Sequence, residues 1–293
     1  MLWAVFTLIG AASQTARNAM QRELTASLGT VGATHVRFLF GFPFALVFLA
    51  GVTVLSGYAL PNFTVSFCAW TIVGALAQIF ATALMLNAMR QRSFVVATAY
   101  IKTEPVQVAL FGLVFLGDVL TLPIVIAIVI ATAGVILTSL KPGQHAAGYQ
   151  PLWMGLSAAA LFALAAVGFR GAILSLDTAS FVMAATFTLA VGLVLQAGLL
   201  SAYLALREPT VLAAIARSWR PSLFAGFMGA LASQFWFLAF ALATAASVRT
   251  LALVEVLFAQ AVARFVFKQS TTGREAIGIV LIVAGVVLLL WAH

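Results

Sequence analysis

The chain has 293 residues, of which 64% are hydrophobic and only 8% are charged, with a net charge of +8. Ordinary soluble domains are about 25% charged, so this composition excludes a water-soluble globular protein. A helix needs about 20 apolar residues to cross the hydrocarbon layer of a membrane. Ten such stretches follow one another: residues 2–21, 31–55, 65–89, 94–116, 121–140, 152–175, 179–205, 221–244, 247–267 and 273–291. The sequence therefore predicts an all-α membrane protein with ten transmembrane helices.

The first stretch, residues 2–21, is expected to be a retained helix and not a signal peptide. No basic residue precedes its apolar sequence, and Gln14, Arg17 and Asn18 interrupt any cleavage pattern.

The sequence contains no pattern typical of catalysis or of cofactor binding. Its single cysteine, Cys68, allows no internal disulfide, and its three histidines lie far apart along the chain. There is no His-Glu-x-x-His pair, glycine-rich phosphate loop or nucleophile elbow. We therefore expect no enzymatic activity, no cofactor and no metal site.

Lysine and arginine residues concentrate in every second connection between the predicted helices. The even connections contain only one arguable cation, Arg249 at the start of the ninth helix. The odd connections contain nine: Arg22, Arg90, Arg92, Lys141, Arg207, Arg217, Arg220, Lys268 and Arg274. Short connections rich in Lys and Arg stay on the cytoplasmic side. The sequence therefore predicts that both termini lie outside and that the positive charge determines topology, with no nucleic-acid partner.

Two segments of the chain, 69–140 and 221–290, resemble each other weakly but in the same order. Glu104 corresponds to Glu255, Thr121 to Thr272 and Gly134 to Gly285. An odd number of helices in each half makes the second half enter the membrane inverted, and inverted repeats around a central site are typical of alternating-access transporters. We expect two inverted five-helix repeats, residues 1–143 and 144–293.

Motifs near the end of the first half resemble a known family. Lys102-Thr103-Glu104-Pro105-Val106 is followed by Leu116-Gly117-Asp118-Val119-Leu120-Thr121, and each half ends with a glycine-bearing helix. This pattern is similar to bacterial EamA-domain members of the drug/metabolite transporter superfamily, with Asp118 where the family usually has Glu. The resemblance implies a multi-pass protein of the bacterial inner membrane. It also implies a central cavity surrounded by helices one to four and six to nine, with helices five and ten outside.

Glu104 is the leading candidate for a functional residue. It lies near the middle of the fourth predicted helix and is followed by Pro105, which removes a backbone hydrogen-bond donor. A carboxyl group at this depth usually faces a cavity, where it binds a proton or a cation. The alternative is a structural ion pair with Lys102 or Arg249. Lys102 points away from Glu104 on a regular helix, so that local pair is unfavourable.

Glu255 occupies the equivalent position in the ninth predicted helix, and inverted symmetry would bring both carboxylates to one cavity. Its alternative role is a salt bridge to Arg249 or Arg264, which would have to be interhelical. Two acidic groups in the core favour a positively charged substrate or a proton antiporter.

Other polar and aromatic residues are expected to complete the substrate site. Gln14 and Arg17 share a face of the first helix. Arg17 and Arg37 are both expected near the cytoplasmic interface. Snorkelling of the Arg17 side chain to the membrane surface would explain its presence as well as substrate contact does. Candidate substrate contacts, each with packing or interhelical hydrogen bonding as its alternative, are Gln14, Gln78, Tyr100, Gln234 and Trp236.

The predicted function is secondary active transport by alternating access. The expected cargo is a small organic metabolite, amino-acid-like or amine-bearing, moved by proton-coupled export. An uncoupled facilitator, exchanger or channel is the alternative, and a receptor or intramembrane enzyme is less favoured because tail domains and catalytic motifs are missing. The expected partners are the substrate, a proton and the lipid bilayer, with the protein as a monomer or homodimer.

Overall fold

The computed structural model describes residues 1–90, 100–139, 150–258, 260 and 272–292, and these residues form helices and no strands. Seven of the described helical segments are long and apolar enough to cross a membrane. They are Glu23–Ser56, Val65–Ala88, Leu122–Ser139, Trp153–Leu174, Phe181–Arg207, Trp219–Leu242 and Gly273–Trp291. The prediction of an all-α membrane protein is confirmed at this level.

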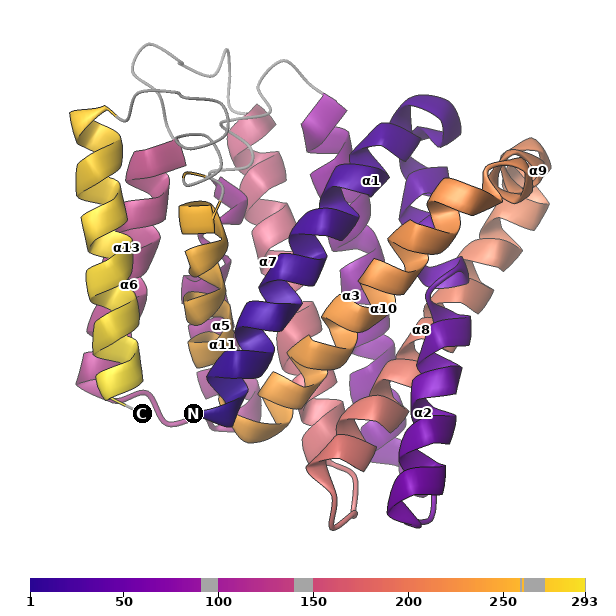
Figure 1. Cartoon of the computed structure of the whole chain (residues 1–293), viewed down its shortest axis with the longest axis horizontal. Coiled ribbons are helices and arrows are strands. Elements are labelled where there is room, and N and C mark those ends of the chain that lie inside the picture. The colour runs from indigo at the N-terminus through magenta and orange to yellow at the C-terminus, as the bar shows by residue number, and fades with distance from the viewer. Residues whose placement is uncertain (91–99, 140–149, 259, 261–271, 293) are drawn as a thin grey trace.

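The first helix, α1 (Leu2–Leu39), consists of two limbs joined at a sharp reversal (Figure 1). Gly29 adopts φ +69° and ψ −179° there, a conformation that is accessible mainly to glycine. The second limb continues into α2 (Phe42–Ser56) after a break at Phe40 and Gly41. This reversal corresponds to the predicted connection between residues 21 and 31.

The remaining elements follow the predicted order with some changes at their ends. They are α3 (Val65–Arg90), α5 (Glu104–Phe111), the π-helix η1 (Gly112–Leu116), α6 (Leu122–Ser139), α7 (Gln150–Leu174), α8 (Phe181–Arg207), α9 (Pro209–Arg217), α10 (Trp219–Leu242), α11 (Ala245–Leu251), the 3₁₀-helix η2 (Ala252–Val254) and α13 (Gly273–Trp291). The predicted ends of the fourth, fifth and ninth helices, at 94–99, 140 and 261–267, lie outside the described residues.

Helices α6 and α13 pack against each other at one side of the bundle (Figure 1). A Cβ added to Gly134 would lie 2.7 Å from the carbonyl oxygen of Gly278, so only glycine permits this close approach. The two helices are apolar and contribute no residue to the lining of the central cavity described below, as expected of helices five and ten.

The centre of the bundle is built from two closely packed helix pairs, α1 with α10 and α3 with α7. A Cβ on Gly168 of α7 would lie 2.8 Å from the backbone nitrogen of Gly74 of α3. Glycine at both positions lets the two backbones touch, which is typical of helix packing in membranes.

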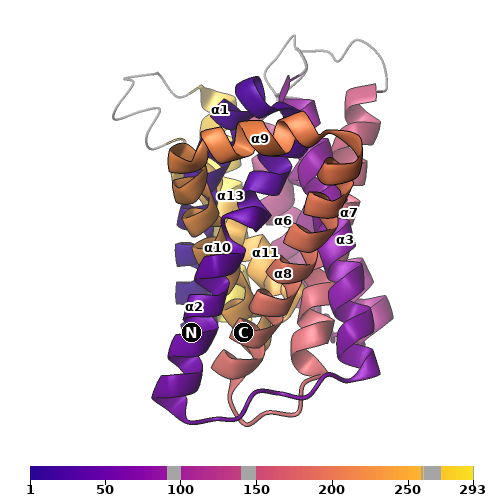
Figure 2. The same ribbon diagram turned by 90° about the vertical axis from the view of Figure 1, so that its right-hand side faces the viewer.

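Helix α9 lies across one end of the bundle, nearly at right angles to the long helices (Figure 2). Sequence analysis predicts a connection here, residues 206–220, and the helix was missed because it is short. Ile215 is only 1% exposed, and Val211 packs beside it against the α1 reversal. Arg217 remains exposed on the other face, so α9 is an amphipathic helix.

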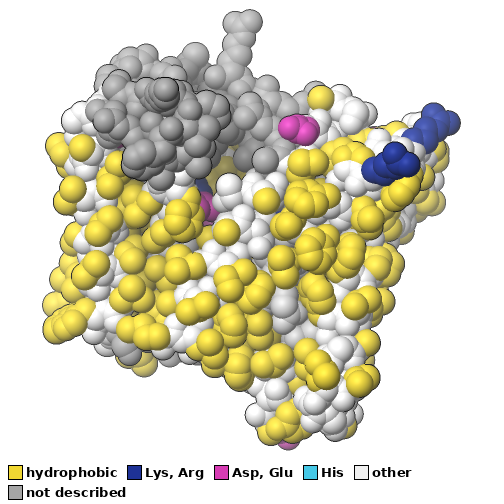
Figure 3. Space-filling model, viewed as in Figure 1, with side chains coloured by type: hydrophobic (Ala, Val, Ile, Leu, Met, Phe, Trp, Pro, Cys, Tyr) yellow, Lys and Arg dark blue, Asp and Glu magenta, His cyan; other side chains and the backbone are white. Residues whose placement is uncertain are grey.

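Both termini lie at the end of the bundle opposite α9 (Figure 1). On the face seen in Figure 3, the described surface between the two ends is dominated by hydrophobic side chains, with basic side chains in the region of α9. This distribution is the one expected of a multi-pass membrane protein.

Candidate functional site

An open cavity lies among the central helices, with about 1000 Å³ of empty space including open solvent. Four cationic and two acidic side chains line it: Arg17, Arg37, Lys102, Arg249, Glu104 and Glu255. It therefore has an excess of two positive charges. Other lining residues include Gln14, Asn18, Gln78, Ser233 and the aromatic residues Phe162, Phe169, Trp236, Phe237 and Phe240.

The two helices that carry the glutamates are interrupted beside the cavity. A turn at Lys102–Thr103 directly precedes Glu104, where the Thr103 amide donates to the Tyr100 carbonyl at 3.1 Å. Pro105 supplies no amide hydrogen, which explains the break. In the other helix, η2 directly precedes Glu255. Interrupted helices expose backbone and side-chain polar groups to a cavity that a continuous helix would cover.

Each glutamate forms an ion pair with a cation from the other interrupted helix. Glu104 Oε1 lies 3.1 Å from Arg249 Nε, and Glu255 pairs with Lys102. All four side chains are mostly buried, between 9% and 23% exposed. The structural alternative considered for Glu104, an interhelical pair with Arg249, is thus present, and the local Lys102–Glu104 pair is not. Glu255 is also paired across helices, but with Lys102 and not with Arg249, while Arg264 lies outside the described residues.

Arg249 also stacks on aromatic rings. Its guanidinium carbon lies 4.6 Å from the ring centre of Trp236 and 5.5 Å from that of Phe240. Cation–π contacts of this kind hold the planar guanidinium in a fixed orientation. Arg249, the one arguable cation in the even connections, is therefore a cavity residue and not a loop charge.

Arg17 and Arg37 differ from the other two cations because no carboxylate pairs with either in the described part of the chain. Each side chain is only 2% exposed. Arg17 donates two hydrogen bonds to the Asn18 side chain, and Arg37 donates to the hydroxyls of Thr82 and Ser233 at 3.3 and 3.4 Å. Both line the cavity, Arg17 from the first limb of α1 and Arg37 from the return limb, and their burial does not fit side chains that snorkel to solvent.

Of the remaining predicted site residues, Gln14, Gln78 and Trp236 line the cavity, whereas Tyr100 and Gln234 are not among its lining residues. The turn at Lys102–Thr103 breaks the helical register that would have placed Tyr100 beside Glu104. Gln234 Nε2 donates to Thr186 Oγ1 at 2.8 Å, an interhelical hydrogen bond between α10 and α8.

Gln78 is fixed by a second glutamine. Gln196 Nε2 donates to Gln78 Oε1 at 2.9 Å and to the Ala75 carbonyl at 3.1 Å. These bonds orient the Gln78 amide at the cavity wall and join α3 to α8.

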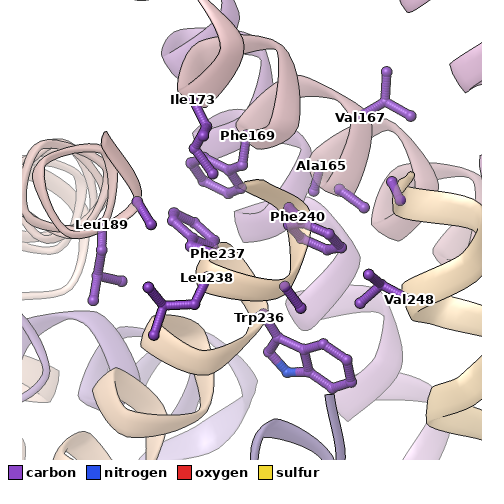
Figure 4. Close-up of a cluster of buried hydrophobic side chains, with 14 of the residues drawn as sticks. Ala165, Val167, Phe169, Ile173, Leu189, Trp236, Phe237, Leu238, Phe240 and Val248 are labelled. Atoms are coloured by element: carbon purple, nitrogen blue, oxygen red, sulfur yellow. The ribbon is translucent and has the colours of Figure 1, made fainter. Parts of the chain in front are cut away.

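Aromatic side chains line the cavity near the C-terminal end of α10. Phe169 of α7 faces Phe237 of α10, with ring centres 4.7 Å apart, and Phe240 lies beside them (Figure 4). Phe240 is two residues from the end of α10. Offset aromatic packing of this kind makes a dry, closely filled layer.

Beyond this layer, Arg170 of α7 ties three elements together. Its guanidinium donates to the carbonyls of Phe240 and Ala243 at 2.7 and 2.9 Å and pairs with Asp118 at 3.0 Å. It therefore satisfies carbonyls at the end of α10, which have no partner within the helix. The Asp118 position, part of the motif that suggested the family, has a structural role here.

The candidate site is a charged, aromatic-lined cavity inside an apolar helical bundle. The EamA-like transporter family matches residues 1–140. The match covers just under half of the chain and indicates a multi-pass membrane transporter of small molecules.

The fold of the chain is shared with a solved structure titled "Crystal structure of protein". The two chains are 17% identical, 99% of each is covered, and the TM-score is 0.68. At this identity the likeness extends to the fold alone. The comparison with curated proteins found no match.

Four cavity residues that carry its charge, Arg17, Arg37, Lys102 and Arg249, were not among the residues predicted from sequence to form the site. The signal for Arg17 and Arg37 is their position inside long apolar stretches, which by itself indicates function. Lys102 and Arg249 were considered only as partners for the glutamates.

Proposed function

We propose that this protein is a secondary transporter that moves a small organic metabolite across the bacterial inner membrane by alternating access. The observation that carries the proposal is a cavity with six charged side chains inside an otherwise apolar bundle. Charged groups inside a membrane-spanning bundle are costly and mark substrate or ion pathways. The lining residues come from both halves of the chain, as a carrier site between two repeats requires.

The two halves in this proposal are inverted five-helix repeats, residues 1–143 and 144–293, with ten membrane spans. Two features support the repeat. The breaks at Lys102–Thr103 and Ala252–Val254 lie at equivalent positions, directly before the equivalent residues Glu104 and Glu255.

The second feature is the contact between α6 and α13. A Cβ on Gly134 would meet the Gly278 oxygen and the Ile282 nitrogen, at 2.7 and 2.8 Å. A Cβ on Gly285 would meet the Ala131 nitrogen and the Ala127 oxygen, at 2.7 and 2.9 Å. The same shift along the sequence relates Gly134 to Gly285, Ala127 to Gly278 and Ala131 to Ile282, so the contact is symmetric under exchange of the halves.

In the proposed transport cycle, the two ion pairs couple the repeats. Glu104–Arg249 and Lys102–Glu255 each join a helix of the first half to one of the second. Movement of one half against the other requires these pairs to open. An unpaired carboxylate within the membrane is costly, so Glu104 released from Arg249 binds a proton, which couples transport to the proton gradient.

The ion pairs also bear on the cargo. An amine-bearing substrate needs an available carboxylate, and both cavity carboxylates already have cationic partners. The proposed cargo is therefore a small organic metabolite for which an amine is not required, and export remains the proposed direction from the family resemblance.

Flux into proteoliposomes under an imposed pH gradient tests this function. A panel of metabolites is compared for the wild type, Glu104→Gln and the control Glu208→Gln, because Glu208 is exposed and distant from the cavity. We expect gradient-driven flux in the wild type and the control and its loss in Glu104→Gln. Flux that survives Glu104→Gln and ignores the gradient assigns Glu104 a structural role and favours a facilitator or exchanger. Absence of flux for every metabolite contradicts transport and favours a receptor.

A further inference from the structure

We propose that the cavity binds an organic anion, with its carboxylate held by Arg17 and Arg37 and its apolar body against the aromatic wall. This inference deepens the proposed transport function and rests on the same cavity. It names a substrate class opposite in charge to the one that two core glutamates suggest.

Charge balance is the first argument. The whole chain contains seven acidic residues: Glu23, Glu104, Asp118, Asp177, Glu208, Glu255 and Glu275. All of them lie in the described part of the chain, and only Glu104 and Glu255 line the cavity. Those two neutralise Arg249 and Lys102, so Arg17 and Arg37 remain as buried cations without a counter-charge.

The position of these two arginines is the second argument. A Cβ added to Gly229 of α10 would lie 3.2 Å from Arg37 Cγ and 3.3 Å from Arg17 Cδ. The two side chains therefore run side by side over one glycine, from opposite limbs of α1. Like charges this close in a buried site repel each other, and an anion between them removes both the repulsion and the desolvation cost.

Hydrogen-bonding capacity is the third argument. Among cavity-lining residues, the buried donors without a hydrogen-bond partner are Arg17 Nη1, Arg37 Nε, Trp236 Nε1 and Arg249 Nε, the last of which lies beside Glu104. The corresponding buried acceptor is Glu104 Oε1, which faces Arg249. The cavity thus has unused hydrogen-bond donors, which favour a ligand with hydrogen-bond acceptors. A carboxylate fits best, because its two oxygens match the paired N–H groups of a guanidinium.

The wall beside the arginines defines the rest of the ligand. Trp236 is 3% exposed, and Phe237 and Phe240 continue the same surface along α10. Binding cavities of this composition, apolar walls with a few convergent polar groups, suit small molecules with one charged end.

Binding to the detergent-solubilised full-length protein tests the inference with three probes of one shape: phenylacetate, phenylacetamide and phenylethylamine. Titration calorimetry measures each dissociation constant. We expect phenylacetate to bind about tenfold or more tightly than the other two, as loss of a charge-assisted hydrogen-bond pair predicts. Preference for phenylethylamine, or no binding of phenylacetate, overturns the inference.

Variants locate the site. Arg17→Gln and Arg37→Gln are each expected to weaken phenylacetate binding about tenfold or more, whereas Arg17→Lys, which keeps the charge, weakens it less. The matched control is Arg217→Gln, because Arg217 is exposed on α9. Should phenylacetate bind equally well to all four variants, the arginine pair is not its site.

The outcomes for binding and for transport are separable. Phenylacetate binding without flux of any metabolite supports the anion site and contradicts transport. Flux restricted to amines supports transport and contradicts the anion site.

Discussion

Arg17 and Arg37 lie side by side over Gly229 at the wall of the central cavity. One comes from each limb of α1, so the reversal at Gly29 brings them together. Neither has an acidic partner in the described residues, whereas Lys102 and Arg249 do. A bundle optimised for stability alone would not retain two such cations, which ties their presence to ligand binding.

Replacement of Arg17 by Gln is expected to leave the ligand-free protein as stable as the wild type or more stable, even though it impairs anion binding. The reason is that the substitution removes a buried charge that has no counter-charge. Thermal unfolding in detergent without ligand measures this. A fall of the unfolding midpoint by several degrees would show that Arg17 has a structural role.

Substitution of Gly134 or Gly285 by Ala is expected to destabilise the protein by about 1–3 kcal/mol, because the added Cβ overlaps backbone atoms of the facing helix. The repeat symmetry predicts similar effects for the two. Gly51→Ala is the control, since a Cβ there meets no atom within 4 Å. Unfolding midpoints compare the three variants, and destabilisation by Gly51→Ala as large as by the other two would refute the packing argument.

Asp118→Asn is expected to destabilise the protein by about 2 kcal/mol while leaving phenylacetate binding unchanged. It removes the charged partner of Arg170, which keeps its bonds to the Phe240 and Ala243 carbonyls. Thermal unfolding and titration calorimetry measure the two effects. Loss of phenylacetate binding with unchanged stability would contradict a structural role for the Asp118–Arg170 pair.

The single cysteine makes membrane orientation accessible to labelling. In a Cys68→Ala background, cysteines at Asp177 and Glu208 occupy exposed positions at opposite ends of the bundle. The charge asymmetry of the connections predicts that an impermeant maleimide labels Asp177→Cys in intact cells and labels Glu208→Cys only after lysis. The reverse pattern would place the termini in the cytoplasm.

The helical fold was predictable because membrane-spanning segments are dominated by length and apolar composition. Prediction placed the α1 reversal between residues 21 and 31, and the family resemblance implied that the helices now seen as α6 and α13 lie outside the cavity. It missed α9, because a nine-residue amphipathic helix resembles a charged connection.

The candidate site was less predictable, because its charged residues form ion pairs between different helices. Spacing along one helix excludes Lys102 as a partner of Glu104, but it contains no information on partners from another helix. The interhelical pairs Glu104–Arg249 and Lys102–Glu255 neutralise both carboxylates, and the remaining Arg17 and Arg37 give the cavity a net positive charge where a negative one was expected. The burial of Arg37 could not be predicted from the sequence either, because it depends on how the two limbs of α1 pack.

The most direct test of the anion-transport proposal is protein-dependent counterflow of phenylpyruvate and of phenylethylamine in proteoliposomes, after subtraction of flux into protein-free liposomes. We expect saturable counterflow of phenylpyruvate that is lost in Arg17→Gln and kept in Arg217→Gln. Saturable counterflow of phenylethylamine alone, unaffected by Arg17→Gln, would contradict it.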